Sequence, residues 1–112
     1  MTLLLSDPVQ IPIFSDTPLY TQRVTLNGSE FLLRFDYSGK EDRWYLSVFD
    51  AAGIAVRRGV KVIPNWDALR LVATETKPRG ILFFADGSRG AKSAPAFADL
   101  GRRVALFYFP EA

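Results

Sequence analysis

Four acidic residues lie close together in the middle of the sequence and are the first candidates for chemistry. They are Asp36, Glu41, Asp42 and Asp50. Two carboxyl groups can act as general acid and general base, as they do in glycoside hydrolysis. Asp residues beside Ser and Gly are also typical of turns, because their side chains hydrogen-bond to the nearby backbone. Turn chemistry is the simpler interpretation, and a small carboxylate hydrolase is the poorest of three functional hypotheses.

A glycine-rich stretch, Asp86–Ser93, contains Arg89 and Lys92 and follows an apolar run. Backbone N–H groups of glycine-rich loops can bind phosphates. This stretch does not fit the P-loop pattern, because Ala91 separates Gly90 from the lysine and no glycine occupies the required upstream position. We therefore interpret it as a loop between two strands.

Two basic pairs, Arg57–Arg58 and Arg102–Arg103, suggest a surface for nucleic acid. Barrels that bind single strands use cations to follow the backbone and aromatic rings to stack the bases. Successive strand residues point to opposite faces, so we expect each pair to divide between two faces. A single-stranded nucleic-acid-binding β-barrel is the alternative hypothesis, against a solvated face balanced by nearby acids.

The composition excludes several kinds of site. The 112 residues include no Cys and no His. Thiol chemistry, disulfides, His-based triads, haem and iron–sulfur ligation and most zinc sites are therefore excluded, and we expect no cofactor and no metal. The net charge of +2 is weak support for nucleic-acid binding. With 48% hydrophobic and 13% aromatic residues, the chain is expected to fold as one domain.

The sequence does not resemble that of a membrane protein. Its longest apolar runs, Ile81–Ala85 and Val104–Phe109, are far shorter than the roughly 18 residues of a membrane span. Leu3, Leu4 and Leu5 lack the basic lead and the long apolar stretch of a signal peptide. We expect a soluble protein made in the cytosol, without membrane insertion.

The dipeptide Asn27–Gly28 predicts a β-hairpin, because Asn-Gly readily adopts the two positive φ angles of a type I′ turn. The flanking residues alternate between apolar and polar side chains. Pairing across the turn places Tyr20 opposite Phe35 and gathers the apolar side chains on one face. A half-buried antiparallel hairpin is therefore expected.

Five further strands are predicted along the chain. They are Val9–Phe14, Trp44–Phe49, Ile54–Ile63, Ile81–Ala85 and Val104–Phe109. Pro12 confines the first strand to a sheet edge, and Gly59 suggests a bulge or a bend in the third.

Two short helices complete the prediction. One follows Pro64, where Asn65 can cap it and Trp66, Leu69 and Val72 recur at helical spacing. The other runs from Pro95 to Leu100 and ends at Gly101. The predicted fold class is mainly β, an antiparallel barrel or sandwich of six to seven short strands with one or two short helices. Residues 1–18 are expected to form an N-terminal arm or edge segment, and residues 19–112 a single β-rich domain.

The strands Ile81–Ala85 and Val104–Phe109 are apolar on both faces. In a small antiparallel domain the chain's own core usually covers only one sheet face. Each large apolar side chain left uncovered forgoes about 1.5–3 kcal/mol. We expect the second face to be covered by the short helices or by another subunit. The predicted interface residues are Leu82, Phe84, Phe107, Tyr108 and Phe109.

Several segments also share a pattern of aromatic-rich strands, an aspartate before a glycine turn, a proline-led short helix and a Leu-Gly pair. They are Arg43–Asp50 with the turn to Gly53, the run to Ile63 followed by Pro64–Leu69, the strand from Gly80 with Asp86 and Gly87, and Pro95–Gly101 leading into Arg103–Tyr108. Together they resemble the small baseplate plug proteins of contractile-tailed bacteriophages. The resemblance extends from Leu19 to Phe109.

The resemblance implies a non-enzymatic protein of the virion, located in the tail baseplate and in the host cytoplasm during assembly. It implies several copies around the tail axis that plug or line the distal tail tube and contact the hub. Strands that are apolar on both faces would become buried on assembly. The loop with Arg89 and Lys92 would face the lumen, the tape-measure protein or DNA, and Met1–Pro18 would be an arm that docks on a neighbour.

Overall fold

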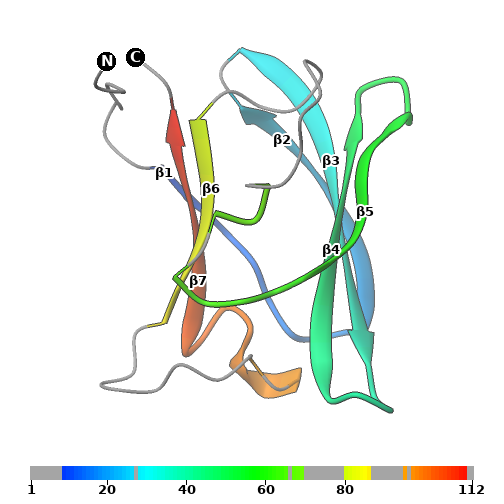
Figure 1. Cartoon of the computed structure of the whole chain (residues 1–112), viewed down its shortest axis with the longest axis vertical. Coiled ribbons are helices and arrows are strands. Elements are labelled where there is room, and N and C mark those ends of the chain that lie inside the picture. The colour runs from blue at the N-terminus through cyan, green and yellow to red at the C-terminus, as the bar shows by residue number, and fades with distance from the viewer. Residues whose placement is uncertain are drawn as a thin grey trace.

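The computed structural model describes residues 9–26, 28–65, 67–69, 80–86, 95 and 97–110. Its strands form two antiparallel sheets that face each other (Figure 1). They are β1 (Val9–Ile11), β2 (Leu19–Leu26), β3 (Ser29–Ser38), β4 (Arg43–Asp50), β5 (Ala55–Lys61), β6 (Gly80–Asp86) and β7 (Val104–Pro110). One sheet has the order β2-β3-β4-β5 and the other β1-β7-β6. The predicted mainly β fold is confirmed, as a sandwich rather than a closed barrel.

The four-stranded sheet is a meander of consecutive hairpins. β2 and β3 pair in the predicted register, with Leu26 opposite Ser29 and Tyr20 opposite Phe35. β4 turns into β5 at Asp50, whose Oδ1 accepts hydrogen bonds from the backbone N–H groups two and four residues later, at 3.0 and 2.9 Å. Local turn chemistry therefore builds this sheet.

β5 is irregular at Gly59, as the sequence predicts. Its pairing with β4 shifts register between Leu46 and Val48, and again before Phe49. Gly59 has a φ of +65°, and its N–H donates a hydrogen bond to Ser47 Oγ at 3.0 Å. A positive φ is readily available to glycine, which explains its place in this bulge.

The three-stranded sheet joins both ends of the described chain. β1 lies at its edge and pairs with β7, with Ile11 opposite Leu106, and β7 pairs with β6, with Phe107 opposite Phe83. The prediction that the N-terminal strand occupies an edge is confirmed. Only Val9–Ile11 of the predicted strand pairs, because the chain leaves the sheet at Pro12.

The chain after β5 crosses from the four-stranded to the three-stranded sheet (Figure 1). The Asn65 N–H donates to the Phe84 carbonyl at 2.6 Å, and the Ala68 N–H donates to the Leu82 carbonyl at 2.7 Å. Asp67 Oδ1 accepts from the N–H groups of Leu69 and Leu82, at 3.1 and 3.3 Å. This segment therefore lies along the free edge of β6.

The prediction of a helix after Pro64 is wrong for residues 64, 65 and 67–69, which form turns and a bridge. Asn65 has a φ of +67°, whereas a helix N-cap has extended backbone. The N–H groups of Asn65 and Ala68, which would lack an intrahelical partner in the first turn of a helix, are bonded to β6. Trp66 and Val72, which also carried the prediction, lie outside the described residues.

Of the second predicted helix, Pro95–Leu100, the structure shows a single 3₁₀ turn, Phe97–Asp99; Leu100 forms a bridge to Val104, and Gly101 follows with a φ of +82°. The Trp44 indole stacks on the Phe97 ring at 5.6 Å between centroids and donates to the Phe97 carbonyl at 3.3 Å. Side chains from both sheets fill the core between them. The largest with less than 2% exposure include Trp44, Phe35, Leu33, Leu46, Phe84, Leu82 and Leu106.

Candidate interaction surfaces

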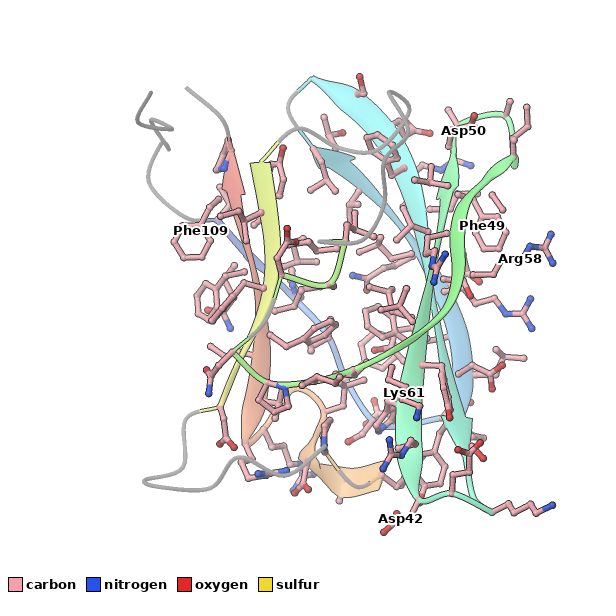
Figure 2. The ribbon with its side chains drawn as sticks, viewed as in Figure 1. Asp42, Phe49, Asp50, Arg58, Lys61 and Phe109 are labelled. Atoms are coloured by element: carbon pink, nitrogen blue, oxygen red, sulfur yellow. The ribbon has the colours of Figure 1, made fainter. Side chains whose placement is uncertain are left out.

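The outer face of the β6–β7 sheet is apolar. The register places Ile81 opposite Phe109 and Phe83 opposite Phe107, so these four side chains share one face. The Phe83 and Phe109 rings meet edge to face at 6.2 Å. All four are partly exposed, and Phe109 points away from the opposing sheet (Figure 2). We name this set of four residues the outer aromatic face.

The five predicted interface residues divide between two faces. Leu82, Phe84 and Tyr108 are 1%, 1% and 3% exposed and belong to the core between the sheets. They are already covered by this chain, because strand alternation directs them toward the four-stranded sheet. Phe107 and Phe109 lie on the outer aromatic face. The sequence prediction missed Phe83 and Ile81, which the same alternation identifies once β6 is paired with β7.

The two segments expected to be helices do not cover this face where the structure describes them. Leu69 is 3% exposed and belongs to the core, and Phe97 packs on Trp44. The first segment lies along the edge of β6, and the 3₁₀ turn packs on the aromatic rings of the other sheet.

The outer face of the four-stranded sheet is polar and carries its own ion pairs. Arg23 Nη1 lies 2.9 Å from Glu30 Oε1, with the two side chains 67% and 41% exposed. Tyr45 Oη donates to Glu41 Oε2 at 2.7 Å. This hydrogen bond, helped by burial, raises the pKa of Tyr45 above its ordinary value. Such a mixed, exposed face is typical of a surface in water.

The basic pairs behave differently from each other. Arg103 bonds to Asp86 at 2.8 Å and to Asp99 at 3.3 Å, and its side chain is only 17% exposed. Arg102 is exposed. Both residues lie in the turn before β7, where strand alternation does not apply, and Arg103 has a structural role.

Arg57 and Arg58 are both exposed, and the register places Arg57 opposite the core residue Val48. The guanidinium of Arg58 lies 5.5 Å from the centre of the Phe49 ring (Figure 2). Lys61 is exposed on the same strand. Within the part of the chain that the structure describes, none of these three cations pairs with a carboxylate.

The four clustered carboxylates are engaged in separate local contacts. Asp42 and Asp50 lie at opposite ends of β4 (Figure 2). Asp42 accepts a hydrogen bond from Tyr37, Glu41 accepts one from Tyr45, and Asp36 lies near an arginine of its own strand. Turn and surface contacts therefore account for these residues.

Some predictions concern residues outside the described ranges. They include Arg89, Lys92 and the first eight residues of the arm. In the described ranges, no helix is long and apolar enough to cross a membrane.

The chain matches the model of a known family. The model of the family described as cyanophage baseplate Pam3 plug gp18 matches residues 9–111, which include both sheets. The search of curated proteins finds no match.

Proposed function

The chain belongs to the family of the cyanophage baseplate Pam3 plug gp18, and on this basis we propose that it plugs or lines the distal end of a phage tail tube. In this role several copies surround the tail axis and contact the hub and the tail-tube protein. The observation that carries the proposal is the family match over residues 9–111, nearly the whole chain. The protein is a phage baseplate component by family, and its function is structural.

The outer aromatic face supports this role. When a partner covers an apolar surface that the chain leaves partly exposed, the complex is stabilised by about 25 cal/mol for each Å² of apolar surface buried. We propose Phe107 and Phe109 as its central contact residues. The polar outer face of the other sheet would stay in water. One side of the sandwich would then contact the assembly and the other would not.

Phage genetics tests the proposal. Phage carrying Phe107→Glu together with Phe109→Glu should assemble tails that lack this protein, as measured by mass spectrometry of purified tails. Phage carrying Ile54→Glu is the matched control, because Ile54 is apolar and 67% exposed but lies at the β4–β5 turn. Circular dichroism of the purified variants checks that both fold. Normal incorporation of the Phe107/Phe109 variant would contradict the proposed contact.

The basic loop has a separate test. We propose that Arg89 and Lys92 face the lumen, where they contact the tape-measure protein or DNA. Reversing both charges should reduce DNA ejection from assembled particles. Intact assembly and ejection in this variant would contradict the lumen role and leave the baseplate assignment standing.

The alternative, a single-stranded nucleic-acid-binding barrel, finds less support. The sandwich is not a closed barrel, and Arg103 is held by two carboxylates. A salt titration of oligonucleotide binding distinguishes the hypotheses, because phosphate-driven binding weakens steeply with salt. We expect no such binding by the isolated protein.

A further inference from the structure

One edge of the four-stranded sheet presents unpaired backbone. β2 pairs only with β3, and the Pro18 carbonyl accepts from the Tyr37 N–H at 2.7 Å. Hydrogen-bonded positions alternate along an antiparallel strand, so the even-numbered residues of β2 bond to β3. The backbone groups directed away from β3 belong to Leu19, Thr21, Arg23 and Thr25.

These groups are almost all without a protein partner. Among the described residues only the Leu19 carbonyl has one, the Thr17 hydroxyl at a long 3.4 Å. The strand is eight residues long and contains no glycine, no proline and no register shift. A long, regular edge of this kind is a template for pairing with another chain.

The other two long edges are protected. β5 carries the Gly59 bulge and three exposed cations, Arg57, Arg58 and Lys61. The edge of β6 is bonded to the crossing segment through Asn65 and Ala68. Bulges, edge charges and covering segments are the usual protections of a sheet edge. In the described part of the chain β2 has neither a bulge nor a covering segment, and its one exposed charge, Arg23, pairs with Glu30 of β3.

The side chains beside the β2 edge define what would fit there. Tyr20 and Val24 face the core and are only partly buried, and both pack against it. On the opposite face Leu19 is 49% exposed, whereas Thr21, Arg23 and Thr25 are exposed polar residues. A strand added at this edge would therefore need apolar side chains on its core face and tolerates one apolar side chain on its outer face.

The first residues of the sequence supply apolar side chains of this kind. Leu3, Leu4 and Leu5 are consecutive apolar residues, so an extended chain places two of them on one face and one on the other. We propose that residues 3–6 of a second copy of this chain add to the β2 edge as a fifth strand. Leu3 and Leu5 would extend the core beside Tyr20, and Leu4 would lie on the outer face.

The choice of a second copy rests on the proposed function. Donor and acceptor are different surfaces of the chain, so the contact is head-to-tail and generates a ring of copies when the rotation closes. Pairing of β2 with β2 of another copy would instead give a closed two-fold dimer. The arm is therefore a connection suited to copies arranged around a tail axis.

Disulfide trapping tests the contact in the purified protein, because the wild-type chain has no cysteine. A Leu4→Cys variant is mixed with Thr21→Cys, Arg23→Cys or Thr25→Cys under mild oxidation. Cross-linking between different chains is expected at one of these outer-face positions, because a disulfide forms only when the two Cβ atoms lie about 4 Å apart. The matched control is Ala55→Cys, an exposed position on the protected β5 edge, which should cross-link far less.

A backbone substitution gives an independent measurement. Thr21→Pro removes one outward N–H and leaves the bonds to β3, since proline is tolerated on edge strands. It should weaken self-association about tenfold or more in sedimentation experiments, whereas Thr21→Ala should have little effect. Deletion of residues 2–6 should abolish the association. This variant leaves β2 unchanged, so it tests the contact even if the proline variant fails to fold.

Three cross-linking results would overturn the inference. They are a cross-link within one chain of the Leu4→Cys/Thr21→Cys double variant at high dilution, preferential Thr21→Cys self-cross-linking, and equal cross-linking at Ala55→Cys. A protein that stays monomeric over a concentration series would also overturn it. None of these results bears on incorporation into tails, so the failure of the arm contact and of the proposed function are distinguishable.

Discussion

The two sheets of this sandwich are assembled in different ways. The four-stranded sheet consists of consecutive strands joined by short turns, and its outer face carries exposed ion pairs. The three-stranded sheet joins β1 to β7 from opposite ends of the described chain, and its outer face is apolar. The local sheet is thus built by its own turns. The non-local sheet depends on contacts between distant segments, and its apolar outer face is partly exposed.

A substitution at Gly101 should have the largest effect on stability among the tests of this difference. Its φ is +82°, and a Cβ at this position would lie 2.2 Å from the carbonyl oxygen of Ile13, just after β1. Gly101→Ala should lower the free energy of unfolding by about 3–4 kcal/mol, from left-handed strain and the displaced backbone together. Urea denaturation measures the loss.

Gly53 is the matched control for that substitution. It has a φ of +84° in the β4–β5 turn, with nothing within 4 Å of its Cβ position. Gly53→Ala should lower stability by only about 1 kcal/mol, the cost of the backbone conformation alone. Equal losses in the two variants would mean that the segment at Ile13 moves aside freely, and that the non-local sheet is not held there.

The ion pairs provide the second test. The side chain of Asp86, which pairs with Arg103, is 1% exposed. The paired side chains of Arg23 and Glu30 in the other sheet are largely exposed. Arg103→Met should lower stability by about 2–3 kcal/mol, because it leaves a buried carboxylate without this cation. Arg23→Met should change stability by about 0.5 kcal/mol or less. Thermal unfolding measures both, with Arg102→Met as the exposed neighbour control.

The local sheet was also the part that could be predicted from the sequence. Asn27–Gly28 and the alternation around it specify the β2–β3 register, and Gly59 marks the bulge. These signals act within a few residues, where backbone conformation and side-chain alternation are set. The same signals place Phe107 and Phe109 on one face once the strands are paired.

The errors arise where a distant segment decides the structure. Asn65 looks like a helix cap in the sequence, but its N–H bonds to Phe84 in another strand. The inward direction of Leu82 depends on which sheet packs against β6. Tertiary pairing overrides local preference at these positions.

Asp50 and Asp67 allow local and non-local hydrogen bonds to be compared directly. Asp50 accepts two backbone N–H groups within its own turn, whereas Asp67 accepts one from Leu69 and one from Leu82 in β6. Asp67→Ala should lower stability by about 2 kcal/mol, because the half-buried N–H groups lose their acceptor. Asp50→Ala should cost about 1 kcal/mol, since water can replace the acceptor in an exposed turn.

The asparagine variants control for the loss of charge in that comparison. Asp67→Asn and Asp50→Asn keep one side-chain oxygen as acceptor. Both should therefore recover most of the stability that the alanine variants lose. If Asp67→Asn were as unstable as Asp67→Ala, the carboxylate charge rather than the acceptor geometry would hold the crossing segment.

The smallest predicted effect concerns Tyr20, which connects the segment after β1 with the four-stranded sheet. Its ring stacks on Phe14 at 4.1 Å and on Phe35 at 5.1 Å, and its hydroxyl oxygen accepts from the Phe14 N–H at 3.1 Å. Tyr20→Phe keeps the stacking and loses this hydrogen bond. At neutral pH it should lower stability by about 1 kcal/mol.

The same variant should respond differently to alkali. Burial, with a smaller contribution from the charge of Asp16, raises the pKa of Tyr20 to about 12 although the Phe14 N–H acts in the opposite direction. In the unfolded chain this tyrosine ionises near pH 10, so the contribution of its neutral form to stability is complete below pH 10 and is lost as the pH rises toward about 12. Urea denaturation at a series of pH values should show the stability gap between wild type and Tyr20→Phe narrowing over this range. The other tyrosines titrate in both proteins and cancel in the difference. If the difference in stability between the two proteins stays constant from neutral pH to pH 12, the Tyr20 hydroxyl is open to water. The contact between the segment after β1 and the four-stranded sheet would then be looser than the ring stacking indicates.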